Sequence, residues 1–114
     1  MPFINTKVNT VISKESELVL KEKLGEAISI IPGKSEQWLM LGFEDNARLY
    51  FRGNGEDKMA FVEVKVFGGE NKAACNELTA RICEIYNDVL GIDKDKIYVK
   101  YETISNWGWN GGNF

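Results

Sequence analysis

The stretch Met59–Phe67, M-A-F-V-E-V-K-V-F, alternates small apolar residues with larger aromatic and charged ones at a period of two. Such a period places successive side chains on opposite faces of a β-strand. One face would carry Ala60, Val62, Val64 and Val66, and the other would carry Phe61, Glu63, Lys65 and Phe67. The alternation therefore predicts a strand with one face on the core and a mixed face opposite.

The unit that begins with this strand also occurs earlier in the chain. In each half a strand is followed by an N-capped helix with one apolar face, a glycine that ends the helix, and a second strand. One constant offset along the chain takes Phe3 to Phe61, Ser13 to Asn71, Leu20 to Leu78, Leu24 to Ile82, Ile28 to Tyr86, Ile31 to Val89 and Gly33 to Gly91. A register kept through strand, cap, helix face and stop indicates an internal duplication of a β-α-β unit.

Two β-α-β units side by side predict an α+β fold, in which a four-stranded sheet carries both helices on one face. We expect a single domain over residues 1–114, with repeats at about 2–54 and 59–104 and a tail at 105–114. The apolar run Trp38–Phe43 is interpreted as a central strand. Ala47–Arg52 and the tail lie outside the β-α-β pattern of the two repeats. We expect short edge strands there, which are suited to pairing with neighbouring subunits.

Composition narrows the function classes. The net charge of −3 gives no basic footprint for nucleic acid, and no apolar run approaches the length of a membrane span. The N-terminus lacks the basic and apolar regions of a signal peptide, so a cytoplasmic location is expected. The chain has no histidine, which excludes the usual catalytic triads and most zinc sites. Cys75 and Cys83 are interpreted as thiols in a reducing compartment.

Pro2 is the first candidate for chemistry. A small residue after Met1 usually leads to removal of the methionine, which would leave Pro2 as a free secondary amine at the start of a strand. An amine held in apolar surroundings has its protonated form disfavoured and becomes a base near neutral pH. The alternative is an idle N-terminal proline. If Met1 stays attached, the Pro2 nitrogen is an amide and cannot be a base.

The whole chain resembles the macrophage migration inhibitory factor family of the tautomerase superfamily. The resemblance lies in Met1-Pro2 opening a strand, the two repeats, Gly33-Lys34 after the first helix, and the ending Trp107–Phe114, W-G-W-N-G-G-N-F. It implies a homotrimer around a central channel, with pockets at the subunit interfaces. It also implies keto–enol tautomerisation of phenylpyruvate-like and dopachrome-like substrates, with Pro2 as the catalytic base.

The resemblance implies further roles in substrate binding. Lys34 would bind the substrate carboxylate, the alternative being a solvated lysine after a helix C-terminus. Phe67 falls where the family has an apolar pocket residue, usually isoleucine, the alternative being core packing. Trp38 falls where the family often has tyrosine, and Trp109 is its tail tryptophan. Both would form aromatic walls for an aryl substrate, while simple packing of the tail against the next subunit is compatible with this role.

Tyr98 matches the family's tyrosine that reaches the neighbouring subunit's pocket. Two residues on, Lys100 departs from an asparagine known in the family. It would add a second cation and help to depress the pKa of Pro2 by like-charge repulsion. The alternative is that Lys100 pairs with Glu63 or Glu102 across the sheet.

The sequence thus predicts an isomerase of the phenylpyruvate tautomerase or L-dopachrome isomerase type, without a cofactor or a metal. Its partners would be a small aryl 2-keto acid and two further copies of the chain. A second hypothesis is a cytokine-like ligand, secreted without a signal peptide, that acts by binding a receptor protein. A third is a structural trimer with a dead site. The stretch Met59–Val62 lacks the CxxC of some family members, so no thiol–disulfide activity of that kind is expected.

Overall fold

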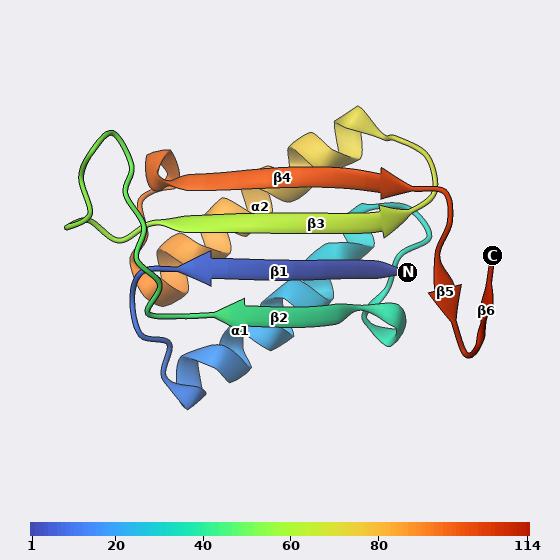
Figure 1. Ribbon diagram of the computed structural model, residues 1–114, viewed down its shortest axis with the longest axis horizontal. Coiled ribbons are helices and arrows are strands. Elements are labelled where there is room, and N and C mark those ends of the chain that lie inside the picture. The colour runs from blue at the N-terminus through green and yellow to red at the C-terminus, as the bar shows by residue number, and fades with distance from the viewer.

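The computed structural model describes all residues from Met1 to Phe114 and forms one mixed sheet with two helices (Figure 1). The strands are β1 (Pro2–Val8), β2 (Met40–Glu44), β3 (Ala60–Phe67), β4 (Ile97–Ile104), β5 (Gly108–Trp109) and β6 (Gly112–Asn113). The helices are α1 (Lys14–Ala27) and α2 (Lys72–Leu90), with short 3-10 turns at Ile28–Ile30, Glu36–Trp38 and Lys94–Lys96.

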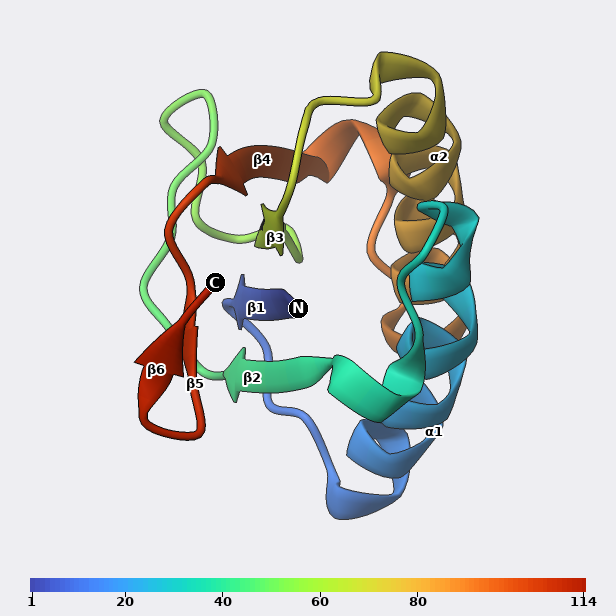
Figure 2. The same ribbon diagram turned by 90° about the vertical axis from the view of Figure 1, so that its right-hand side faces the viewer.

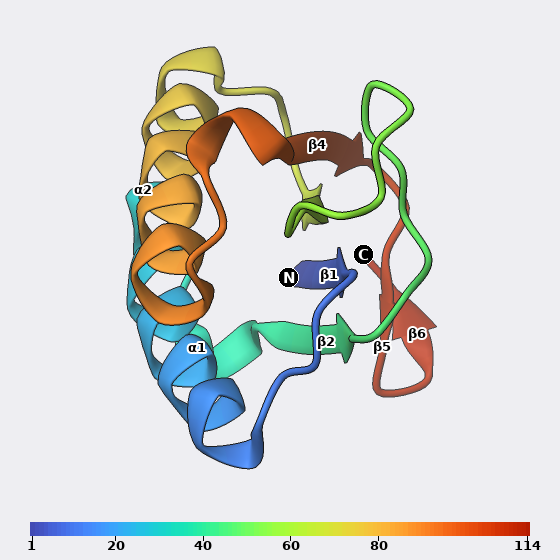
Figure 3. The same cartoon turned by 90° about the vertical axis from the view of Figure 1, so that its left-hand side faces the viewer.

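The main sheet has the strand order β2-β1-β3-β4. β1 and β2 are parallel, as are β3 and β4, while β1 and β3 pair antiparallel at the centre. Each half of the chain is therefore one β-α-β unit. Both helices cover the same face of the sheet (Figures 2 and 3). The predicted α+β architecture with two repeats is confirmed.

The two helices begin with equivalent caps. The side-chain oxygen of Ser13 accepts a hydrogen bond from the Ser16 amide at 3.1 Å, and that of Asn71 accepts one from the Ala74 amide at 3.0 Å. These pairs are related by the offset between the repeats, and each satisfies one amide of a first helical turn. Gly91 ends α2 in the left-handed conformation, at φ 70°, which glycine adopts without steric cost.

The core lies between the helices and the sheet, where the predicted faces meet. The alternating residues of β3 and the apolar stripes of both helices are buried as expected, except that Val89 is only half-buried. Thr6 is the one polar residue in this set of buried side chains, and its hydroxyl bonds the hydroxyl of Tyr86. Burial raises the pKa of Tyr86, so this buried pair stays neutral.

Two sequence predictions about strands are wrong. The apolar run Trp38–Phe43 is not a central strand: the strand is Met40–Glu44, it lies at an edge of the sheet, and Trp38 belongs to the 3-10 turn before it. The first strands of the two repeats pair with each other, which leaves the second strands outside. Ala47–Arg52 forms no strand, and Phe51 makes only an isolated bridge to Asn54.

The tail forms its own small element. β5 and β6 pair antiparallel as a two-stranded ribbon separate from the main sheet, so the tail is not an edge strand of that sheet within one chain. The ribbon lies beyond the end of the sheet at which β1 begins (Figure 1).

Neither helix combines the length and the apolar character needed to cross a membrane.

Candidate functional site

A cleft of about 560 Å³ opens where β1 begins, and we call it the N-terminal cleft. Pro2 is buried as the first residue of β1 and pairs with Val66 of β3. The cleft is lined by Met1, Pro2, Phe3, Gln37, Trp38, Leu39, Met40, Lys65, Trp107, Gly108 and Trp109. The duplicated sheet therefore supplies the floor, and the tail ribbon supplies a wall that belongs to neither repeat.

The wall of the cleft is aromatic. The rings of Trp38 and Trp109 meet edge to face, with centroids 5.1 Å apart and planes at 88°. Such pairs contribute about 0.5–1.5 kcal/mol beyond the area they bury, so this contact helps to hold the tail against the turn before β2. All three tryptophans of the chain line the cleft. The structure thus brings the predicted residues Trp38 and Trp109 to Pro2.

Lys34 approaches the start of the chain from the loop after α1. Gly33 turns this loop at φ 81°, and the Lys34 ammonium then donates a hydrogen bond to the Phe67 carbonyl at 2.6 Å. The amide of Phe67 in turn donates to the Met1 carbonyl at 3.1 Å. Lys34, Met1 and the end of β3 are therefore linked, and the Lys34 charge lies close to the N-terminal amine.

The environment makes that amine a weaker base than usual. Burial is the larger cause of a lowered pKa of the Met1 amino group, because the charged form loses hydration. The neighbouring Lys34 ammonium lowers this pKa further. Both effects favour the neutral amine. An amino group at this end of β1 is thus available to accept a proton at lower pH than an exposed one.

Phe67 does not line the N-terminal cleft with its side chain. Its ring packs against the ring of the C-terminal Phe114, with centroids 5.3 Å apart, while its backbone carbonyl holds Lys34. Within one chain its contribution near Pro2 is to position the Lys34 ammonium and to pack the end of the tail.

Tyr98 and Lys100 lie far from Pro2 in the same chain. Tyr98 is in register with Phe61, five positions along β3 from the Val66 that pairs with Pro2, which is about 17 Å at the usual rise of a strand. Its ring meets Phe51 and Phe61 edge to face in a separate cavity of about 230 Å³.

Lys100 forms an ion pair with a neighbour on its own strand. Its ammonium lies 2.8 Å from the Glu102 carboxylate, as one of the two alternatives for this residue predicted. This contact raises the pKa of Lys100 and lowers that of Glu102. The charge of Lys100 is compensated within the chain.

Sequence reasoning missed Lys65, which it placed only on the mixed face of a strand. Because β1 and β3 are antiparallel, Lys65 is in register with Phe3 and lines the N-terminal cleft. The signal that could have found it is the pairing of the two repeats through their first strands, which sets residues 65 and 66 beside residues 2 and 3.

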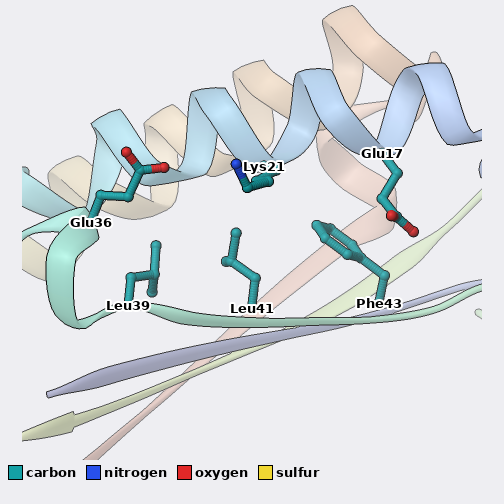
Figure 4. Close-up of a pocket in the computed structure, with 6 residues that line it drawn as sticks. All are labelled: Glu17, Lys21, Glu36, Leu39, Leu41 and Phe43. Atoms are coloured by element: carbon teal, nitrogen blue, oxygen red, sulfur yellow. The ribbon is translucent and has the colours of Figure 1, made fainter.

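A larger cavity of about 600 Å³ lies between α1 and the edge strand β2. Figure 4 shows Leu41 and Phe43 of β2, and Leu39 just before it, directed toward the helix. Glu17, Lys21 and Glu36 lie around them. The duplication accounts for this cavity: the offset between the repeats takes Glu17, Lys21, Leu41 and Phe43 to Cys75, Thr79, Val99 and Tyr101, which line a second cavity between α2 and β4.

The second cavity is partly closed by hydrogen bonds that the first lacks. The Tyr101 hydroxyl donates to the Cys75 carbonyl at 2.9 Å and lies 2.8 Å from the Thr79 hydroxyl, and burial raises its pKa to about 12. Phe43, the equivalent residue, has no hydroxyl. Both cavities are thus the gap that each repeat leaves between its helix and its edge strand, and neither gathers the predicted site residues.

Comparisons with known proteins agree with this architecture. The family model described as macrophage migration inhibitory factor (MIF) matches residues 1–114. The structure is similar to Leishmania major MIF2, at 30% identity and a TM-score of 0.93, covering 100% of this chain and 97% of that one. It is also similar to a macrophage migration inhibitory factor homologue from Prochlorococcus marinus, at 29% identity and a TM-score of 0.83, covering 98% of each chain.

A more distant similarity concerns the fold alone. A fused 4-OT protein described as a wild-type symmetric trimer is 18% identical, with a TM-score of 0.84 over 96% of this chain and 93% of that one. No curated protein matches the chain by sequence.

No group of three or more histidine, cysteine or acidic side chains is placed to hold a metal ion.

Proposed function

Since the chain belongs to the macrophage migration inhibitory factor family, in the tautomerase superfamily, we propose that it is a keto–enol tautomerase with the Pro2 nitrogen as its base. The substrate is a small aryl 2-keto acid of the phenylpyruvate or dopachrome type, and no cofactor takes part. The observation that carries the proposal is the buried position of Pro2 at the floor of an aromatic cleft. Beside it lies Lys34, whose charge lowers the pKa of an amine at the start of the chain.

The reaction needs only one proton-carrying group in reach of two substrate atoms. Removal of Met1 frees the Pro2 nitrogen as a secondary amine. Its neutral form accepts a proton from the carbon next to the keto group, and the resulting ammonium returns that proton to the keto oxygen as the enol forms. Atoms and charge balance without a co-reactant, and the reverse sequence gives ketonisation.

The surroundings support each step. Burial and the Lys34 charge lower the pKa of an amine at the chain start, and a Pro2 amine lies one residue deeper in the same environment. The Lys34 ammonium would hold the substrate carboxylate as a point charge. Trp38 and Trp109 would receive the aryl ring against their faces and edges. Turnover of phenylpyruvate by protein whose intact mass shows the loss of Met1 tests the function.

The pH dependence of the reaction tests the link between Lys34 and the base. Two cationic side chains lie near the chain start, Lys34 from the loop after α1 and Lys65 from β3. A like charge lowers the pKa of the amine, so Lys34→Met is expected to raise it. The acid limb of kcat/KM for phenylpyruvate, which follows deprotonation of the base, then moves to higher pH, and KM rises because the carboxylate clamp is lost.

The control for this experiment is Lys23→Met, which removes an exposed charge from α1. It is expected to leave the acid limb where the unchanged protein has it. An acid limb that stays in place in Lys34→Met, or that shifts equally in both variants, would contradict the assigned role of Lys34.

We propose further that the active form is a homotrimer around a central channel, in which Tyr98 of one subunit completes the cleft of the next. Two observations support this. The cleft and Tyr98 lie near opposite ends of the sheet, and the edge strand β2 exposes 68% of Met40, an apolar residue that an interface would cover. Adjacent copies could bring the two parts together.

Sedimentation equilibrium is expected to give three times the chain mass of 12.9 kDa. Tyr98→Ala is expected to keep this mass and to lower kcat/KM for phenylpyruvate about tenfold, as loss of one oriented substrate contact does. A monomer with full turnover would refute the assembly.

A further inference from the structure

Lys65 is the only charged side chain that lines the N-terminal cleft. The other lining groups are the chain start, apolar and aromatic residues, a glycine and the neutral amide of Gln37. An ammonium among aromatic walls has few places to find a counter-ion within the cleft. This lysine is therefore the charged side chain that the lining of the cleft presents to an incoming ligand.

The register of the central strands determines its position. Lys65 lies between Phe3 of β1 and Glu102 of β4, on the face of the sheet away from the helices. Its neighbours along β3, Val64 and Val66, are buried on the other face. Since β1 and β3 are the two central strands, this lysine is held by rigid backbone on both sides.

The charge of Lys65 is only weakly compensated. Its ammonium lies 3.7 Å from the Glu63 carboxylate, and both side chains are 34% exposed, so the pair contributes little and is easily exchanged for another anion. Glu102, which lies opposite, is already bonded to Lys100 at 2.8 Å. Lys34 is a second cation at the chain start. It lies beside the N-terminal amine and outside the lining of the cleft, and its ammonium donates to the Phe67 carbonyl.

We propose that Lys65 is a specificity-determining residue that binds a second anionic group, so that the preferred substrate is a dianionic aryl 2-keto acid. This inference rests on the proposed tautomerase function. One carboxylate is held by Lys34 and the other by Lys65, with the enolisable carbon at Pro2 between them. A monoanionic substrate binds Lys34 alone, and Lys65 then keeps its ion pair with Glu63.

The test compares two substrates that differ by one carboxylate, phenylpyruvate and 4-carboxyphenylpyruvate. Lys65→Met is expected to raise the ratio of KM for the dianion to KM for phenylpyruvate about tenfold, the effect of losing one charge-assisted contact of ordinary strength. Lys65→Arg keeps the charge and is expected to restore the preference. The matched control Lys23→Met removes a lysine outside the cleft and is expected to change neither value.

A binding measurement separates this inference from the proposed reaction. Because all three tryptophans line the cleft, their fluorescence reports binding there. The unreactive probes are phenylacetate and 4-carboxyphenylacetate, titrated into the unchanged protein and into Lys65→Met. The dicarboxylate is expected to bind more tightly, and this preference is expected to vanish in Lys65→Met.

Each outcome decides one of the two claims. A dicarboxylate preference that depends on Lys65, in a protein that turns over neither keto acid, supports the anion site and refutes the tautomerase. Turnover with equal KM for both keto acids, or a preference that survives Lys65→Met, overturns the inference about Lys65 and leaves the tautomerase standing.

Discussion

Pro2→Gly is expected to lower kcat/KM for phenylpyruvate by about a hundredfold to ten-thousandfold, the usual contribution of a positioned acid–base group. Glycine at position 2 still permits removal of Met1, but it leaves a primary amine on a flexible residue. That amine is not held by a ring at the start of β1, and it loses the fixed geometry toward the substrate carbon that proton transfer needs. The measurement is steady-state turnover, with intact mass recorded for both proteins.

A second variant tests the amine in a different way. One leucine inserted between Met1 and Pro2 is expected to block removal of the methionine, because the residue after it is then large. The Pro2 nitrogen stays an amide, and turnover is expected to fall at least as far as in Pro2→Gly. Full turnover by either variant would refute the mechanism, while loss in both with unchanged circular dichroism would support it.

Leu20→Ala is expected to lower the free energy of unfolding by about 3 kcal/mol, within the range for leucine-to-alanine changes in packed cores. Leu20 lies on the apolar face of α1 and is 0% exposed, and it is part of the contiguous core between the helices and the sheet. Its truncation leaves a cavity that the surrounding strands and helices cannot close. The measurement is urea unfolding at one fixed protein concentration, because assembly would couple stability to concentration.

Leu18→Ala is the matched control on the same helix. Leu18 is 51% exposed, so its truncation removes little buried area and is expected to change the free energy of unfolding by less than about 1 kcal/mol. Equal losses in the two variants would show that α1 does not pack by the face that carries Leu20. Leu78 is the equivalent of Leu20 in the second repeat and is equally buried on α2, so Leu78→Ala is expected to lower the free energy of unfolding by a similar amount.

Local pattern accounts for most of what was predicted correctly. The alternation in β3, the caps at Ser13 and Asn71, and the left-handed stop at Gly91 each depend on a few neighbouring residues, and all are where the sequence placed them. The run Trp38–Phe43 was misplaced for the opposite reason. An apolar run is compatible with a central strand and with an edge strand alike, so composition could not distinguish the two.

The candidate site divides in the same way. Pro2, Lys34, Trp38 and Trp109 came from the residue pattern and the family resemblance, and the structure brings them to one end of the sheet. The pocket role of Phe67 stays a prediction: within one chain its ring contacts the tail and its carbonyl holds Lys34. The direction of a side chain at a strand end depends on the segments that pack there, which the sequence does not show.

The sequence by itself determined the two helices and the strands β1, β3 and β4, because helix and strand periods, caps and stops are local. It also determined the duplication, because a repeat kept at constant spacing is visible wherever it falls. Only the tertiary structure decided the strand order, the approach of Lys65 to Pro2 and the separation of Tyr98 from it. These depend on the register between β1 and β3, strands that lie far apart along the chain. Register is a property of the paired sheet, and no single stretch of the chain contains it.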